Sequence, residues 1–208
     1  TFRRRGAERV GFPSIVGVGP NATILHYDRS RRQAQSGDLG VADVGAEFGY
    51  YTADITRTWP VSGKYTPEQK AIYDIVLEAQ ESGIRMTKPG VTLGEIHANS
   101  VRKVTEGLVK LGILKGNVDE LVNTGAYFKY FMHGTSHHLG LDVHDYGNIY
   151  RKFEPGMVFT VEPGIYIREE NLGIRLENDV VIRENGIEDL METIPVEAEE
   201  IEELMNRK

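Results

Sequence analysis

The stretch DLGVADVGAEFGYYTADITRTWPV, residues 38–61, decides the fold class of this chain of 208 residues. It contains two runs rich in Val, Ile, Thr and small residues, joined by a glycine- and tyrosine-rich segment. This composition predicts a β-hairpin that turns near residues 48–50. Each arm carries one aspartate, Asp43 or Asp54, among apolar or small neighbours. Because the two are placed symmetrically about the Phe48–Gly49 bond, we expect their side chains to face each other.

A second pair of runs, GMVFTVEPGIYI (156–167) and GIRLENDVVIRE (173–184), repeats this layout. Glu162 and Glu177 are placed symmetrically about the turn segment REENLG, again among Val, Phe, Ile and Leu. Carboxylates held this close repel each other unless they share a proton or a cation. Two hairpins with the same layout therefore indicate an internal two-fold relation, with four carboxylates converging between them.

The segment MHGTSHHLGLDVHD, residues 132–145, holds four of the six histidines of the chain. A buried histidine needs a hydrogen-bond partner or a ligand. Four carboxylates and one imidazole form a hard, oxygen-rich site that suits a pair of Mn²⁺, Fe²⁺, Co²⁺ or Zn²⁺ ions. Two such ions would also neutralise the four negative charges. His137, flanked by His133 and His144, is the expected fifth ligand.

Helical patterns fill the space between the hairpins. Two long helices are predicted over 66–86 and 92–111, each with a threonine at its N-cap. A short helix is predicted in GNVDELVNTGA and a last one over 198–205, whereas the segment 13–27 predicts a strand, a turn and a second strand. Hairpins separated by helices predict an α+β fold with an antiparallel sheet.

Composition narrows the classes of function. The net charge is −7, from 24 basic and 31 acidic residues, which argues against nucleic acid as a partner. The chain has no cysteine, which excludes disulfides and thiolate metal sites. No window approaches the length of an apolar membrane span, so we expect no membrane association and a cytoplasmic location.

Four segments in this order resemble the pita-bread metallopeptidases: ADVGAEFGYYTADITRTWPVSGKYTPEQ, HGTSHHLGLDVHD, TVEPGIYI and GIRLENDV. The resemblance is strongest to the Xaa-Pro aminopeptidases (the aminopeptidase P group), with prolidases next, and it covers about residues 11–203. It implies a pita-bread fold: a curved antiparallel sheet with pseudo-two-fold symmetry and helices on its outer face. Residues 11–208 would then be the catalytic domain, and residues 1–10 the end of a linker or of an N-terminal helix.

The resemblance also implies a ligand set for two divalent metal ions per chain. Mn²⁺ is the expected metal, with Co²⁺, Zn²⁺ and Fe²⁺ as alternatives. Glu162 would in addition act as the catalytic base on a water molecule activated by the ions. The implied metal ligands are Asp43, Asp54, His137, Glu162 and Glu177.

Further roles follow from the same resemblance. His133 and His144 would assist catalysis and contact the substrate, and His26 and Tyr166 would help to form the proline pocket. Arg175 would orient the metal-binding carboxylates through hydrogen bonds. His138 receives no role.

The implied reaction is hydrolysis of the bond between an N-terminal residue and a following proline, in a peptide with a free N-terminus. Prolidase activity and methionine aminopeptidase activity are alternatives within the fold; SHHLGLDVHD and GIRLENDV favour the proline-directed branch. A metal-free binding module is the alternative from another class, and the intact ligand types speak against it. Because related enzymes carry an N-terminal domain, we expect this chain to be the catalytic portion of a longer protein. That full-length protein could form a homo-oligomer.

Overall fold

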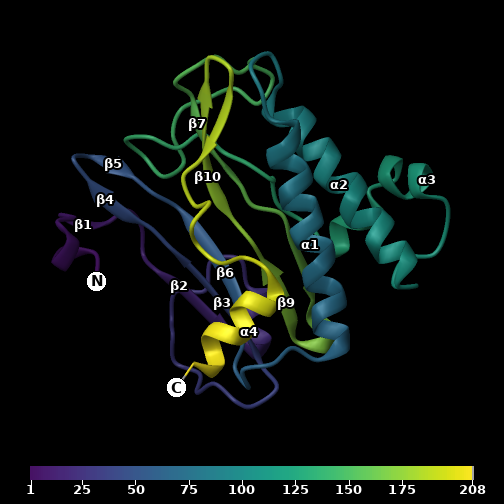
Figure 1. Cartoon of the computed structure of the whole chain (residues 1–208). Coiled ribbons are helices and arrows are strands. Elements are labelled where there is room, and N and C mark those ends of the chain that lie inside the picture. The colour runs from purple at the N-terminus through teal and green to yellow at the C-terminus, as the bar shows by residue number, and fades with distance from the viewer. Residues whose placement is uncertain (208) are drawn as a thin grey trace.

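Two long hairpins and the helices between them dominate the computed structural model, which describes residues 1–207 (Figure 1). All strand pairs within these residues are antiparallel, which confirms the predicted α+β class. The strands are β1 (Arg9–Val10), β2 (Ile15–Val18), β3 (Leu39–Val44), β4 (Ala46–Phe48), β5 (Tyr51–Thr52), β6 (Ile55–Pro60), β7 (Val158–Val161), β8 (Gly164–Ile167), β9 (Leu172–Arg175), β10 (Asn178–Arg183) and β11 (Gly186–Asp189). The helices are α1 (Pro67–Met86), α2 (Leu93–Lys110), α3 (Val118–Asn123) and α4 (Ala198–Asn206), with 3₁₀ turns η1 (Arg3–Arg5), η2 (Gly19–Thr23), η3 (Ala126–Lys129) and η4 (Arg168–Glu170).

The strand pairing of the first hairpin is centred one residue later than predicted. Its tip is a two-residue loop, Gly49-Tyr50, in which both residues have positive φ (57° and 70°). This loop centres the pairing one residue later, so Asp43 lies opposite Thr56 and not opposite Asp54. The expected direct facing of the two aspartates is therefore wrong. They still share one face of the hairpin, because Asp54 is two residues from Thr56.

The second hairpin has the predicted register. β7 pairs with β10 and β8 pairs with β9 in one continuous register. Glu162 lies between β7 and β8, and Glu177 lies between β9 and β10. The two glutamates therefore face each other at a break between two ladders, as expected.

Helices α1 and α2 lie side by side along the hairpins (Figure 1). Capping boxes begin both helices, with Thr66 and Thr92 as N-caps, which confirms the predicted starts. α1 packs against β7, β8 and β9, and its apolar face enters the larger of two core clusters. The helices cross closely at Gly107, where a Cβ atom would lie 2.6 Å from Ile75. Among residues 1–207, no helix combines the length and the apolar composition that a bilayer crossing requires.

The segment 13–27 differs from its predicted strand–turn–strand form. β2 is present, but the 3₁₀ turn η2 follows it, and residues 24–27 form no strand. The reason is a close tertiary contact, since a Cβ atom at Gly173 in β9 would lie 2.0 Å from the Ala22 oxygen. Backbone packing against β9 thus replaces strand pairing here. At the N-terminus, the pair Arg9–Val10 adds a short strand beside β4.

Gly45 provides a test of how closely the first hairpin is packed beside Asp54. A Cβ atom at Gly45 would lie 1.7 Å from the Ala53 oxygen, so Gly45→Ala must push the two strands apart. We expect a loss of about 1–3 kcal/mol in the free energy of unfolding, measured by urea denaturation in EDTA.

Gly94→Ala is the matched control. Its Cβ would meet only ordinary contacts from 3.5 Å, in the first turn of α2. Alanine there should be neutral or stabilising by up to about 1 kcal/mol. Equal effects of the two substitutions would show that the strands near Asp54 are not closely packed.

Candidate metal centre

The first hairpin contributes two buried aspartates. Asp43 on β3 and Asp54 just before β6 expose only 8% and 5% of their surface. Asp43 Oδ2 accepts a hydrogen bond of 2.7 Å from Arg175. The Oδ1 atoms of both aspartates are buried and have no hydrogen-bond partner within residues 1–207. Unpaired buried carboxylate oxygens are costly, which indicates that these atoms are available to a ligand.

The second hairpin contributes two glutamates that are tied to their surroundings by threonines. Glu177 is 1% exposed, and its Oε2 accepts a hydrogen bond of 2.6 Å from Thr56 Oγ1. Its backbone N–H donates to the Thr56 oxygen at 3.1 Å. Glu162 Oε1 accepts from Thr160 Oγ1 at 3.2 Å. Thr56 therefore connects the two hairpins directly at the carboxylate cluster.

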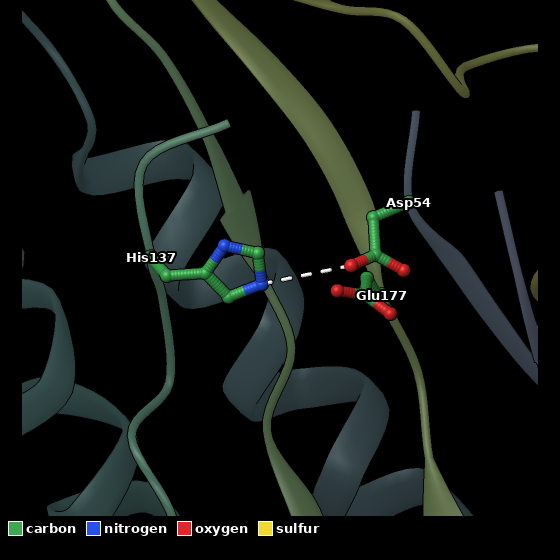
Figure 2. A group of neighbouring side chains, drawn as sticks. All are labelled: Asp54, His137 and Glu177. Atoms are coloured by element: carbon green, nitrogen blue, oxygen red, sulfur yellow. Dashed lines mark ion pairs between the residues drawn. The ribbon is translucent and has the colours of Figure 1, made fainter. Parts of the chain in front are cut away.

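The histidine loop places one imidazole against these carboxylates (Figure 2). His137 is held through its backbone, since its carbonyl accepts the Thr160 N–H at 3.0 Å. Its Nδ1 donates to the His138 carbonyl at 3.0 Å, so Nε2 is the atom that points into the cluster. Nε2 lies 3.3 Å from Glu162 Oε1 and 3.6 Å from Asp54 Oδ2. One ligand atom each from Asp54, His137 and Glu177 lies within 4.8 Å of the others.

The close, buried carboxylates of this cluster favour the binding of cations. Burial raises the pKa of Glu177 well above its ordinary value and also raises the pKa of Glu162. Burial together with the neighbouring Asp54 raises the pKa of Asp43 to about 7, although Arg175 opposes the shift. Burial disfavours the charged form of His137, but Asp54 and Glu162 outweigh it and raise its pKa. Four carboxylates facing one guanidinium are far more stable when metal ions share the site.

Arg175 is the cation that the fold itself supplies. It is 4% exposed and donates from separate nitrogen atoms to Asp43, to Tyr166 Oη at 3.1 Å and to Thr56 Oγ1 at 3.1 Å. The guanidinium thus orients one aspartate and, through Thr56, the Glu177 carboxylate. Fixed carboxylates hold a metal ion better than mobile ones.

His133 is locked in one neutral form. Its Nδ1 donates to the Gly134 carbonyl at 2.8 Å, so Nε2 accepts the Tyr166 hydroxyl at 2.9 Å. Tyr166 Oη accepts in turn from Arg175. Burial lowers the pKa of His133 to about 4. Both ring nitrogens are occupied, so a contact with another group requires exchange of one of these bonds.

A cavity of about 260 Å³ collects nearly every residue expected at the site. His26 and His144 are exposed at its rim, and the rings of His144 and His137 are 4.2 Å apart between centroids. Tyr166 is 1% exposed and does not line the cavity; it lies behind His133 and Arg175. The predicted residues along the cavity are His26, Asp43, Asp54, His133, His137, His144, Glu162, Arg175 and Glu177.

An adjoining hollow of about 310 Å³ shares part of this wall. It has a more apolar lining, which includes Phe12, Pro13, Ile15 and Val143. The two hollows together offer a charged centre beside an apolar surface, the usual composition of a small-ligand site.

Two residues at the site were not identified from the sequence. Thr56 alternates with Asp54 and Thr58 on one face of the strand, a pattern of small polar residues that could have indicated a buried polar face. Asp179 follows Glu177 by two residues on the same face and accepts a hydrogen bond of 3.0 Å from the Asp54 N–H. That contact joins residues far apart in the sequence, and no local pattern indicates it.

The chain matches known metallopeptidases over nearly its whole length. The sequence profile of metallopeptidase family M24 matches residues 1–184. The Xaa-Pro aminopeptidase of Escherichia coli K12 is 48% identical over 98% of this chain and 49% of its own length. A zinc-substituted E. coli aminopeptidase P in complex with product superposes with a TM-score of 0.97 at 48% identity, covering 100% of this chain and 50% of that one. The E. coli aminopeptidase P structure with the inhibitor Pro-Leu gives a TM-score of 0.95 at 48% identity, over 98% and 49% of the two chains. This chain therefore spans about half the length of these relatives.

The neutral form of His133 has a consequence for stability against pH. Its pKa in the folded protein, about 4, lies below its ordinary value of 6.5, so protons bind the unfolded chain more strongly. The stabilisation that neutral His133 contributes is complete above pH 6.5 and is lost as the pH falls towards 4. We therefore expect wild-type protein to lose free energy of unfolding relative to His133→Gln across this range. Urea denaturation in EDTA measures it, and parallel pH profiles would contradict a neutral buried His133.

Proposed function

Because this chain belongs to metallopeptidase family M24, we propose that it is the catalytic part of a metal-dependent aminopeptidase that releases an N-terminal residue preceding proline. One observation carries the proposal: a buried cluster of carboxylates and an imidazole lies in a chain that is 48% identical to an Xaa-Pro aminopeptidase over 98% of its length. The peptide substrate would have a free N-terminus and proline in second position.

The carboxylate and imidazole donors present fit divalent metal ions, and we propose that two ions are bound and that the metal is Mn²⁺. The buried Oδ1 atoms of Asp43 and Asp54 lack hydrogen-bond partners within residues 1–207 and are therefore free to bind them. When bound, such ions supply Lewis-acid activation of the scissile carbonyl and of the attacking water. The side chains that would hold them are Asp43, Asp54, His137, Glu162 and Glu177.

Glu162 is suited to proton transfer in this reaction. Its carboxylate lines the cavity and lies 3.3 Å from His137 Nε2, so it can reach a water molecule bound among the proposed ligands. Thr160 Oγ1 donates to its Oε1 and limits its rotation. Glu162 would accept a proton from the attacking water and return one to the nitrogen of the leaving proline, so that the proton balance closes within one turnover.

The substrate would lie across the cavity with its amino group beside the carboxylate of Asp54. The exposed rim residues His26 and His144 would contact the proline residue, and the His144 ring already lies beside that of His137. His133 would assist by exchanging one of its present hydrogen bonds for the substrate, while Tyr166 holds its ring in place. The apolar hollow beside the cavity offers a surface for a substrate side chain.

We also propose that the two hairpins are related by a pseudo-two-fold axis in a pita-bread fold, with α1 and α2 on its outer face. Each hairpin has a break between two ladders, and each places a carboxylate at that break: Asp54 in the first, Glu162 and Glu177 in the second. The superposition of this chain on E. coli aminopeptidase P, with a TM-score of 0.97, supports the proposal.

Hydrolysis of matched peptides with Mn²⁺ supplied tests the function. We expect turnover of an Xaa-Pro-Pro peptide and little or no turnover of the same peptide with alanine in second position. A Met-Ala peptide cleaved in preference would identify a methionine aminopeptidase, and cleavage confined to the dipeptide Xaa-Pro would identify a prolidase. Absence of Mn²⁺ binding by elemental analysis would instead support a metal-free binding module.

The metal assignment predicts opposite outcomes for two neighbouring histidines. His137→Ala removes a nitrogen ligand and should lower metal occupancy and turnover together. His138→Ala should leave occupancy near that of wild type, because His138 forms a bridge to Phe159 and its ring packs against Gly147. Elemental analysis beside kinetics decides between them. Loss of metal from the His138 variant alone would show that the loop is assigned one residue out of register.

A further inference from the structure

The backbone N–H of Asp54 has an unusual partner. Ala53 donates its N–H across the first hairpin to the Ala46 carbonyl at 2.9 Å. Successive residues of an antiparallel strand point their N–H groups to opposite edges, so the N–H of Asp54 points away from β3 and towards the second hairpin. No strand of the described residues pairs with β6 on that edge. A buried N–H at this position therefore needs a side-chain acceptor.

Asp179 supplies that acceptor. It lies on β10, where its register is set by pairing with Thr160 on β7, and it is 1% exposed. Its Oδ2 accepts the Asp54 N–H at 3.0 Å. Two residues earlier on the same face, Glu177 makes the neighbouring junction, donating its N–H to the Thr56 oxygen at 3.1 Å. The two contacts hold Asp54 and Thr56, two residues apart at the start of β6, against the second hairpin.

We propose that Asp179 is a positioning residue for the metal centre: by accepting the Asp54 N–H, it fixes where the Asp54 carboxylate meets His137 and Glu177. This inference rests on the metal site of the proposed function. Asp54 comes from the first hairpin, whereas Glu177 and Asp179 come from the second, so the hydrogen bond sets the separation of groups that must share ions. Asp179 itself does not line the cavity, so its action on the metal passes through Asp54.

Substitutions at Asp179 can distinguish the effect of its hydrogen-bond acceptor from the effect of its negative charge. Asp179→Asn keeps an oxygen that can accept the Asp54 N–H, but removes the carboxylate charge. Asp179→Ala removes both, and Asp179→Leu removes both while filling most of the space. Asp189→Ala is the matched control, because this carboxylate lies on the neighbouring strand β11 and accepts from Asn178 and Met191, neither of which is a proposed metal ligand.

The measurements are the affinity for Mn²⁺ by calorimetric titration of the full chain, its metal-free melting temperature, and kcat and KM on an Xaa-Pro peptide. We expect Asp179→Ala and Asp179→Leu to weaken Mn²⁺ binding by about 10- to 100-fold. Excess Mn²⁺ should restore the turnover of these two variants. The restored quantity should be kcat, with little change in KM. Asp179→Asn and Asp189→Ala should bind Mn²⁺ nearly as wild type does, whatever their melting temperatures.

Three outcomes would overturn the inference. Unchanged Mn²⁺ affinity in both the alanine and the leucine variants, with only a lower melting temperature, would show a purely structural role. Equal losses in the asparagine and alanine variants would show that the charge matters and the hydrogen bond does not. An equal loss in Asp189→Ala would show an unspecific effect on the β10–β11 hairpin. Failure of wild-type protein to bind Mn²⁺ would instead contradict the proposed function, so the two failures are distinguishable.

Discussion

The burial of four carboxylates beside a single guanidinium is the constraint on which this structure depends. Isolated buried charges are too costly to persist, so such a cluster exists only if a cation, a proton or a hydrogen bond reaches each oxygen. Arg175 and Thr56 satisfy some of these oxygens, and Oδ1 of Asp43 and of Asp54 remains without a partner within residues 1–207. The apolar core supplies the stability, while this polar centre limits how the two hairpins can be arranged.

Short polar side chains along the contact between the two hairpins, here called the seam, supply hydrogen bonds to these buried groups. Thr58 and Thr56 are fully buried on β6, and both exchange hydrogen bonds with the second hairpin near Arg175 and Glu177. Asp179 continues the seam at Asp54. Each contact satisfies a buried backbone or side-chain group, and the Thr56 contact also orients the Glu177 carboxylate. The hydrogen bonds that satisfy these buried groups therefore also preorganise the site.

Neighbouring histidines of the site differ in pKa because their surroundings differ. His133 is kept neutral by burial and by its contact with Tyr166, whereas carboxylates draw the neighbouring His137 towards the charged form. Two histidines four residues apart thus carry different chemistry. Such divergence of pKa values among neighbouring groups is typical of sites with assigned acid, base and ligand roles.

The sequence by itself determined the α+β class, the long helices with their capping boxes and the register of the second hairpin. These features follow from local patterns: alternation along strands, helical periodicity and cap residues. It also brought Asp43, Asp54, Glu162 and Glu177 to one site, because a buried acid in an apolar strand is conspicuous, whereas His26, His144 and Arg175 were expected there only from the family resemblance. Only the tertiary structure decided the register of the first hairpin, because the Gly49-Tyr50 loop moves its centre by one residue. It alone also decided the 3₁₀ turn after β2 and the hydrogen bond between Asp179 and the Asp54 N–H, since both depend on backbone contacts between residues far apart in the chain.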